Sequence, residues 1–456
     1  MEALIVLFAS GLISLFIAFA KKPSLVVTSA LLGLAATIAL IVNQLITHKA
    51  LIDLSYTGLY FDNSALKFGL ATTILTALMI GIGYEKFKDA PNHTGEYIGL
   101  LLISSTGALI MFAFTDMFMF FLGLEILSIP IYVMAGSNKS DLRSNESSLK
   151  YFLTGSFATG IILFGIAWVY GATGSFNLAE IGSAAAQGAD NSLLLVGILL
   201  ILSAFLFKVG AAPFHFWSPD VYDGAPHAVT GFMASVVKLA AFGAFLKLFI
   251  LCFGTVELKA FWGPALAILI VLTLFVGNLS ALRQVSLKRM LAYSSITHVG
   301  YTLLIVLTSS ISSVDDLWFY MFAYGFSIAG IIAVGIAVND EEDKIDALKG
   351  LGQRNPFLAF VGILSVLSLA GIPLTSGFFG KYMVFTAAWN SYWWLVIIAL
   401  INSAISIYYY LKLITAMMSK SDVPQEKITI SPLTALMLAI SIVGMLGLTF
   451  ITASIF

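Results

Sequence analysis

The sequence predicts an all-α membrane protein that crosses the bilayer many times. Of its 456 residues, 59% are hydrophobic and only 10% are charged, whereas roughly 25% of the residues in a soluble domain are charged. Apolar stretches of about 18 or more residues recur along the chain, and each can cross a hydrocarbon core of about 30 Å. The stretches lack the alternating pattern of strands, so we expect helices, whose backbone hydrogen bonds are satisfied internally.

Hydropathy predicts about fourteen spans. In chain order their ranges are 3–20, 24–46, 64–84, 96–114, 116–136, 147–171, 191–212, 226–252, 261–281, 290–309, 316–338, 357–389, 392–414 and 431–455. The first range ends in Ala18-Phe19-Ala20, as a signal peptide would. However, Glu2 precedes it and Lys21 and Lys22 follow it, so we interpret it as a retained span.

Basic residues gather in one set of alternate loops, which indicates the orientation of the chain. That set holds fourteen of them: Lys21, Lys22, Lys86, Lys88, Lys139, Arg143, Arg283, Lys288, Arg289, Lys344, Lys349, Arg354, Lys420 and Lys427. The opposite set holds only Lys49 and Lys259. Because basic loops remain on the cytoplasmic side, and the number of spans is even, both termini are predicted to face outward.

Composition and motifs exclude several functions for the chain itself. The net charge of −1 indicates neither a nucleic-acid partner nor an acidic one. The single cysteine, Cys252, excludes disulfides within the chain and an Fe–S cluster held by it alone. Gly350-Leu351-Gly352 follows no predicted strand and Gly81-Ile82-Gly83 lies inside a span, so neither is a nucleotide-binding loop. Redox or nucleotide chemistry therefore belongs to another chain.

Seven lysines lie within or at the ends of the predicted spans. They are Lys67, Lys150, Lys208, Lys238, Lys247, Lys381 and Lys412. A charge at the centre of a membrane helix costs about 2.5–3.5 kcal/mol, so each lysine needs an explanation. For Lys67, Lys247 and Lys412, close to span ends, the amine can reach the interface while the stem stays in lipid. For Lys150, this explanation and a functional role fit equally well.

The remaining lysines and one acid indicate function. Lys238 lies at the middle of its span, whereas Lys208 and Lys381 lie beside interruptions of theirs. Glu125, also within a span, is the matching acid, with Lys208 and Lys238 as candidate partners; a purely structural ion pair is the alternative. A buried amine whose proton affinity depends on a nearby carboxylate suits a proton relay. His215 and His298 could extend that relay, or could be ordinary helix–helix contacts.

Two spans are interrupted by glycine and proline at corresponding places. One interruption is Gly210-Ala211-Ala212-Pro213, and the other contains Gly371, Pro373, Gly377 and Gly380. Interrupted spans in two halves of a chain are typical of inverted-repeat transporters and mark their ion sites. We therefore predict a three-helix segment at 1–95, two inverted five-helix repeats at 96–252 and 261–414, each with one broken helix, and a final helix at 431–456.

These residues lie in segments that resemble the N-type antiporter-like membrane subunits of bacterial NADH–quinone oxidoreductase, respiratory complex I. The segments are GLEILSIPIYVMAG around Glu125, ESSLKYFLTGSFATG around Lys150, FKVGAAPFHFWSPDVYDGAP from Phe207, SVVKLAAF around Lys238, LKRMLAYSSITHVGY at 287–301, LKGLGQRNP at 348–356 and GIPLTSGFFGKYMVF around Lys381. The resemblance covers most of the chain between about 96 and 390.

The resemblance implies roles for the site residues. Glu125 and Lys208 would form a charge pair, Lys238 would be the central proton relay, and Lys381 would control exit to the outer side. Lysine at 381 favours the N type over the related M type, which carries an acid there. Partners would be the antiporter-like and quinone-module membrane subunits and the peripheral NADH-oxidising arm, within a bacterial inner membrane. FMN, Fe–S clusters and quinone would belong to those partners, with no cofactor or metal on this chain.

Other membrane functions remain as alternatives. A subunit of a multi-subunit cation/proton antiporter, or of a hydrogenase-linked proton pump, would share this fold and its lysines. A small-solute transporter would need more polar groups at the interruptions, and a structural scaffold would not need Lys238 at mid-bilayer.

Overall fold

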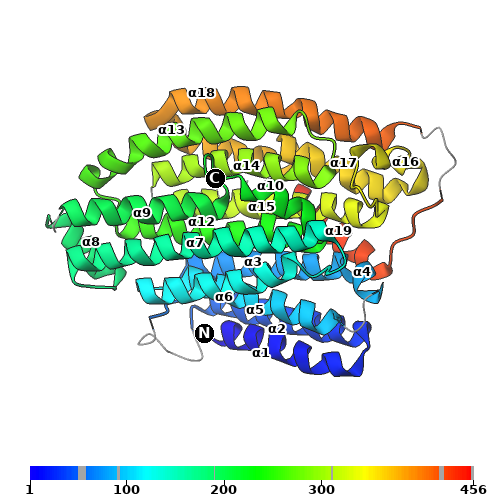
Figure 1. Ribbon diagram of the computed structural model, residues 1–456, viewed down its shortest axis with the longest axis horizontal. Helices are drawn as coiled ribbons and strands as arrows, with labels where there is room; N and C mark the ends of the chain where they lie inside the picture. Colours follow the sequence, from blue (N-terminus) through cyan, green and yellow to red (C-terminus); the bar gives the residue numbers. More distant parts are fainter. Residues whose placement is uncertain (50–57, 90–92, 189–190, 310–311, 421–425, 453–456) are drawn as a thin grey trace.

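The computed structural model describes residues 1–49, 58–89, 93–188, 191–309, 312–420 and 426–452. Long helices lie roughly side by side along one direction of the molecule (Figure 1). Within these ranges there is no strand, and β pairing is limited to three isolated bridges: Leu59–Phe114, Asp116–Asn177 and Ser286–Lys344. The all-α prediction is confirmed.

The α-helices of the described ranges account for most of their residues. They are α1 (Glu2–Ile17), α2 (Pro23–Thr47), α3 (Asn63–Ile82), α4 (Tyr84–Asp89), α5 (Thr94–Ala113), α6 (Met117–Ala135), α7 (Leu142–Thr173), α8 (Leu178–Ala186), α9 (Asn191–Val209), α10 (Trp217–Gly224), α11 (His227–Phe232), α12 (Lys238–Leu251), α13 (Val256–Ala281), α14 (Leu287–Thr308), α15 (Ser313–Val338), α16 (Leu351–Arg354), α17 (Pro356–Ala370), α18 (Ser376–Met418) and α19 (Pro432–Thr452). A π-helical turn, Met233–Val237, joins α11 to α12.

Thirteen helices of the described chain are long and apolar enough to cross a membrane. One of them, α18, contains a kink at Tyr392, where φ is −138° and ψ is 40°. The kink divides α18 into two parts, the first of which continues the shorter α17 as one broken span. Counted in this way, the structure agrees with the prediction of about fourteen spans, including the predicted boundary between 389 and 392. Positions 453–456 of the predicted last segment lie outside the described residues.

The helices pack in two similar groups. In the first, α5 packs against α6 and α7 against α9; in the second, α13 packs against α14 and α15 against α17 and α18. Helices α1 and α2 pack together beside α5 at one side of the bundle, and α19 packs against α3 and α15 (Figure 1). Each group contains a helix broken at the predicted place. The exact division of the chain at 1–95, 96–252, 261–414 and 431–456 stays a prediction.

Both breaks begin at a glycine in the left-handed region, which other residues rarely adopt. Gly210, after α9, has φ 75°, and Gly371, after α17, has φ 78°. The backbone groups that the breaks release find other partners, as buried backbone must. The Ala212 amide donates to Thr273 Oγ1 at 3.1 Å, and the Ala370 carbonyl accepts a hydrogen bond from Lys381 Nζ at 2.9 Å.

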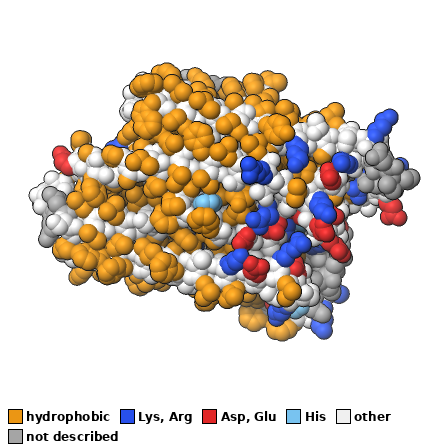
Figure 2. All heavy atoms as spheres, turned by 45° about the horizontal axis from the view of Figure 1, so that its top comes forward, with side chains coloured by type: hydrophobic (Ala, Val, Ile, Leu, Met, Phe, Trp, Pro, Cys, Tyr) orange, Lys and Arg blue, Asp and Glu red, His pale blue; other side chains and the backbone are white. Residues whose placement is uncertain are grey.

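Charged side chains gather at one end of the face shown in Figure 2, while hydrophobic side chains cover most of the rest. We call this region the charged end and define it by residues around one cavity there, among them Lys86, Arg143, Lys288 and Asp340. The opposite end, near Asp62 and Val314, is called the outer end, because the sequence predicts that it faces outward. The apolar flank between the two ends is what a membrane-spanning protein presents to lipid.

We predict that Gly371→Ala destabilises the protein by about 1 kcal/mol, because alanine at positive φ is strained. The new Cβ would also lie 2.8 Å from Lys381 Cδ, displacing that side chain. The measurement is the thermal unfolding midpoint in detergent. Gly160→Ala on α7 is the matched control, since its Cβ would meet nothing within 4 Å. Equal midpoints for the two variants would contradict the strain at Gly371.

Candidate functional site

Lys208 occupies the last turn of α9, at the edge of the first break, and is only 6% exposed. Its ammonium donates to Ser128 Oγ at 2.5 Å and to Tyr132 OH at 3.4 Å, and it lies 5.3 Å from the centroid of the Tyr132 ring. The carboxyl end of a helix carries partial negative charge, which stabilises a cation there. The break, the helix end and two hydroxyls of α6 together hold this amine inside the membrane region.

Glu125 lies on α6 one turn before Ser128. It is half-buried and accepts a hydrogen bond from Thr159 Oγ1 of α7 at 2.8 Å. No ion pair joins it to Lys208 among the described residues; the lysine amine contacts Ser128 and Tyr132 instead. Ser128 follows Glu125 by three residues, and such positions lie on the same side of a helix. The charge pair implied by the resemblance is thus not a direct contact here; an electrostatic coupling stays a prediction.

Lys238 is 4% exposed and begins α12 directly after the π-helical turn. Its ammonium donates to Ser295 of α14 twice, to the hydroxyl at 2.5 Å and to the carbonyl at 3.3 Å. The Tyr222 ring centroid lies 5.9 Å from the same nitrogen. Single π turns inside helices are rare and are frequent at functional sites. Lys238, which the sequence places at the middle of its span, is 4% exposed and thus almost completely surrounded by protein.

His298 follows Ser295 by three residues on α14 and is 6% exposed. Both of its ring nitrogens have tyrosine partners: Nδ1 lies 2.7 Å from the Tyr320 hydroxyl and Nε2 lies 3.1 Å from the Tyr410 hydroxyl. Tyr410 is also hydrogen-bonded to Ser294. The imidazole thus joins α14, α15 and α18 through groups that can both donate and accept protons.

Lys381 mirrors Lys208 at the second break. It is 4% exposed, and its ammonium donates to the last carbonyl of α17, that of Ala370, and to Ser403 Oγ of α18 at 3.1 Å. It lies 5.0 Å from the ring centroid of Tyr301, which follows His298 by three residues on α14. Ser295, His298 and Tyr301 therefore form one line along α14 between Lys238 and Lys381.

Lys208, Lys238, His298 and Lys381, all 4–6% exposed, are called the central row, and His215 lies outside it. His215, 8% exposed, lies within the first break, and its ring packs against Phe216 with the centroids 4.4 Å apart. None of its contacts in the described structure reaches a lysine of the row. Its relay role stays a prediction without a visible connection.

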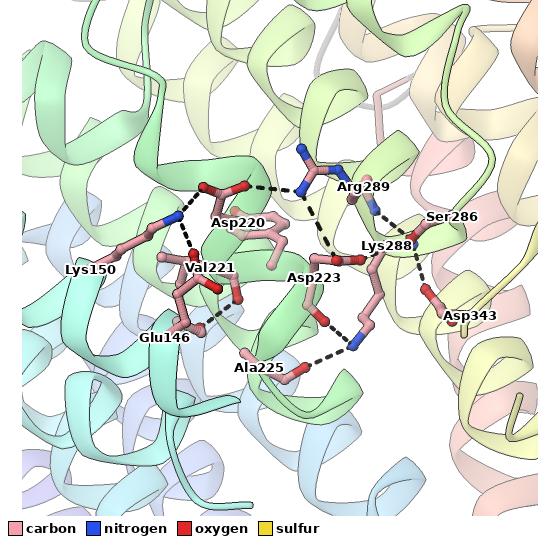
Figure 3. Close-up of polar contacts among 12 residues, drawn as sticks. Glu146, Lys150, Asp220, Val221, Asp223, Ala225, Ser286, Lys288, Arg289 and Asp343 are labelled. Carbon is pink, nitrogen blue, oxygen red and sulfur yellow. Dashed lines mark hydrogen bonds and ion pairs between the residues drawn. The ribbon is translucent and has the colours of Figure 1, made fainter. Parts of the chain in front are cut away.

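Lys150 belongs to a separate network of charges at the charged end (Figure 3). Its ammonium contacts Glu146 at 2.5 Å and Asp220 at 2.6 Å, and its side chain is 41% exposed. Arg289 of α14 binds the other oxygen of Asp220 at 2.9 Å. Both cations act on the Asp220 carboxyl: burial raises its pKa, but the hydrogen bonds from Lys150 and Arg289 outweigh burial and hold the pKa below its ordinary value. Asp220 therefore ties α7 and α14 to α10.

The three lysines placed near span ends behave in two ways. Lys67 pairs with Asp315 at 2.7 Å with both side chains exposed, and exposed Lys412 reaches the Gln284 carbonyl at 3.2 Å. Both agree with an amine that reaches the interface. Lys247 is half-buried and donates to the Phe112 carbonyl at 2.8 Å beside a cavity of about 240 Å³ at the outer end.

Sequence reasoning missed the hydroxyl groups that hold the row together. They are Ser128, Tyr132, Ser295, Tyr320, Ser403 and Tyr410. The rings of Tyr222 and Tyr301, which were also missed, lie beside Lys238 and Lys381. The usable signal was the polar spacing in AYSSITHVGY, where Ser295, His298 and Tyr301 recur every three residues. Across the described residues, no group of three or more His, Cys, Asp or Glu is placed to hold a metal ion.

A membrane-embedded bundle with paired broken helices and a buried lysine at each break defines the class of antiporter-like membrane subunits. Comparison with known proteins narrows the class. The family model described as NADH:quinone oxidoreductase/Mrp antiporter, TM, matches residues 115–406. NADH-quinone oxidoreductase subunit N of Cytophaga hutchinsonii is 45% identical over 375 residues, which cover 81% of this chain and 80% of the relative.

Solved structures agree with this assignment. A chain of respiratory complex I from Thermus thermophilus matches with a TM-score of 0.84 and 31% identity, covering 98% of this chain and 96% of that one. A chain of the archaeal membrane-bound sulfane sulfur reductase matches with a TM-score of 0.83 and 27% identity, covering 97% and 94%. The chain belongs to the NADH-quinone oxidoreductase subunit N family, and the resemblance seen in the sequence is confirmed.

We predict that Asp220→Asn lowers the thermal unfolding midpoint more than Lys150→Met. The first change weakens contacts to two cations from two helices, at about 1.5–3 kcal/mol for hydrogen bonds to charged groups. The second removes an exposed amine worth at most about 1 kcal/mol, and Asp220 keeps Arg289. The loss in Lys150→Met should shrink further at high salt, because exposed pairs are screened. An equal or reversed order would refute the bridging role of Asp220.

Proposed function

We propose that this chain moves protons across a bacterial inner membrane as the N-type membrane subunit of NADH–quinone oxidoreductase. The observation that carries the proposal is the row of three buried lysines, 4–6% exposed, each beside a helix break or a π turn. Ionisable groups this deep in membrane helices are expensive and usually mark ion pathways. Family membership supports the assignment of the chain to an electron-transferring complex, since the relatives are named as subunits of this oxidoreductase.

The mechanism begins at α6. Glu125 and Ser128 lie one turn apart, so a change of charge at Glu125 alters the field at the Lys208 ammonium that Ser128 binds. A charge on Glu125 and the charge on Lys208 interact electrostatically across this turn. Inside protein, charges interact several-fold more strongly than in water. An interaction of a few kcal/mol is comparable with the work of moving one charge across a membrane potential, about 2.3 kcal/mol per 100 mV.

The second half of the path uses α14. A proton on Lys238 has Ser295 as its acceptor at 2.5 Å, and His298 and Tyr301 follow along the same helix toward Lys381. His298 with its two tyrosine partners can take up a proton on one nitrogen while releasing one from the other. Lys381, beside the second break, is the exit group.

Redox chemistry is assigned to partner subunits. We propose that FMN, Fe–S clusters and quinone are held by the peripheral NADH-oxidising arm and the quinone-module membrane subunits, and that other antiporter-like subunits adjoin this chain. The matched structures support a multi-subunit setting, because both come from respiratory membrane complexes. The chain itself contributes the proton path.

The charged end is proposed to face the cytoplasm, with both termini on the periplasmic side. Fourteen Lys and Arg residues in its loops against two in the opposite loops support this orientation.

A subunit of a cation/proton antiporter, or of another electron-transfer-linked pump, is the second candidate. The family model includes Mrp antiporters in its description, and the sulfane sulfur reductase chain shares the fold. Purification of the tagged protein in mild detergent decides between them. Flavin and Fe–S absorbance with NADH–quinone reductase activity supports the first proposal. A colourless assembly of membrane subunits with cation-dependent proton exchange supports the second.

We predict that Lys238→Met and Lys208→Met slow proton transport through this chain by about 100-fold or more, the scale for loss of a positioned acid–base group. Methionine keeps the length of the side chain without its charge. The measurement is protons translocated per NADH oxidised, in proteoliposomes containing the whole complex. Lys412→Met is the control, since Lys412 is exposed and lies outside the row. Pumping at the control level in both variants would refute the relay.

The orientation is tested with single cysteines at the two ends of α13, in a Cys252→Ala background. Val285 and Val256 are both exposed, at 67% and 80%. A membrane-impermeant thiol reagent added to intact spheroplasts should label Val256→Cys and leave Val285→Cys unlabelled. Inverted vesicles should give the opposite pattern. The reverse result in both preparations would place the charged end outside.

A further inference from the structure

The first break contains a buried backbone amide, that of Ala212, which its own helix does not satisfy. The two preceding amides, of Gly210 and Ala211, donate to carbonyls in the last turn of α9 at 3.0 and 2.8 Å. Ala212 is 0% exposed, and its amide donates instead to Thr273 Oγ1 at 3.1 Å. Since a buried N–H group needs a partner, the first break depends on an oxygen from α13, a helix of the second group.

The second break has no amide to satisfy at the corresponding position. Counted from the glycine with positive φ in each break, Pro373 stands where Ala212 stands in the first, and proline has no amide hydrogen. The preceding Ile372 amide donates to a carbonyl of α17 at 3.0 Å, and the Gly377 amide donates to Ser368 Oγ of the same helix at 3.3 Å. The need for an oxygen from the other helix group is therefore a property of the first break.

The Thr273 side chain is oriented to accept this hydrogen bond. It is 0% exposed, and its hydroxyl donates its proton to the Leu269 carbonyl, one turn earlier on α13, at 2.6 Å. The oxygen therefore keeps its lone pairs for the Ala212 amide. Further along α13, Asn278 Nδ2 donates to the backbone and side-chain oxygens of Asn402 on α18 at 2.8 and 2.9 Å. The helix that presents the acceptor is thus itself bound to a neighbour in the second group.

The turn of α9 that precedes this break carries Lys208. The carbonyl of the adjacent Phe207 accepts a hydrogen bond from Trp217 Nε1 at 3.0 Å. Trp217 therefore holds the last turn of the helix, while Thr273 holds the backbone that leaves it. The position of this turn sets where the Lys208 side chain starts on its way to Ser128, which its ammonium contacts at 2.5 Å.

We propose that Thr273 is a positioning residue for Lys208. By binding the Ala212 amide it fixes the first break, and the fixed break holds the lysine where its ammonium meets Ser128. The inference rests on the proposed function and adds to it a residue of the second helix group that acts on the lysine of the first. Thr273 carries no proton along the path, since both of its hydrogen-bond partners are backbone groups.

The first test is Thr273→Val, which keeps the shape of the side chain and removes the hydroxyl. The initial rate of proton translocation, in proteoliposomes containing the whole complex, should fall by about tenfold or more, since a misplacement of about 1 Å can cost about 100-fold in rate. Thr273→Ser keeps the oxygen and should restore most of the rate. Thr73→Val is the matched control and should pump as the wild type does. Thr73 is also 0% exposed, and its hydroxyl bonds to the Gly69 carbonyl of its own helix.

The outcomes separate this inference from the proposed function. Wild-type pumping by Thr273→Val, together with loss in Lys208→Met, would overturn the positioning role alone. Wild-type pumping by both variants would overturn the proposed function as well. A loss in Thr273→Ser equal to that in Thr273→Val would also overturn the positioning role, because the hydroxyl oxygen would then not be the group that matters.

The second test observes the break directly and does not depend on pumping. Hydrogen–deuterium exchange of the peptide that contains Ala212, followed by mass spectrometry of the whole complex, should be about tenfold faster in Thr273→Val and unchanged in Thr73→Val. Thr273→Cys, whose sulfur is a weak acceptor, serves where the valine variant does not assemble. Its exchange and pumping should lie between those of the serine variant and complete loss. Exchange at the wild-type rate in Thr273→Cys and Thr273→Val would overturn the inference.

Discussion

The cost of placing an ammonium group inside a membrane-embedded bundle governs the rest of this structure. Each central lysine must find oxygen atoms without access to bulk water, and the fold supplies them where regular helices would not. Lys208 lies in the last turn of α9, and the Lys381 ammonium, from α18, reaches the last carbonyl of α17; both α9 and α17 stop in mid-bundle. There the released carbonyls and the helix dipole are favourable to positive charge.

The same requirement explains the hydroxyl-rich helix faces. Serine and tyrosine can bind an ammonium and equally well its neutral amine, since a hydroxyl both donates and accepts. A carboxylate in direct contact would fix the charged form. Lys208 is held by Ser128 and Tyr132 while Glu125 lies one turn away, so its direct partners are neutral hydroxyls and not a carboxylate. For the proposed relay, such neutral partners matter more than a strong ion pair.

Much of the fold followed from composition and local chemistry. Apolar length predicted the spans, and glycine with proline predicted both breaks, because the backbone preferences of these residues are local. The kink at Tyr392 lay at the predicted boundary of two spans, yet the sequence there carries neither residue, so its geometry was not predictable. The π turn before Lys238 was missed for the same reason.

Asp220, which joins Lys150 to Arg289, is 70 and 69 residues from these partners. Only the folded arrangement makes such pairings visible.

The π turn has a geometric consequence for everything that follows it on α12. A π turn accommodates one residue more than an α turn, and in an α-helix one residue corresponds to a rotation of about 100° around the axis. The extra residue within 233–237 therefore sets the rotational register of Lys238 relative to α11. Were the same five residues in ordinary α geometry, α11 would keep its place while the lysine turned by about 100°, away from Ser295. The π turn thus decides which helix the central amine faces.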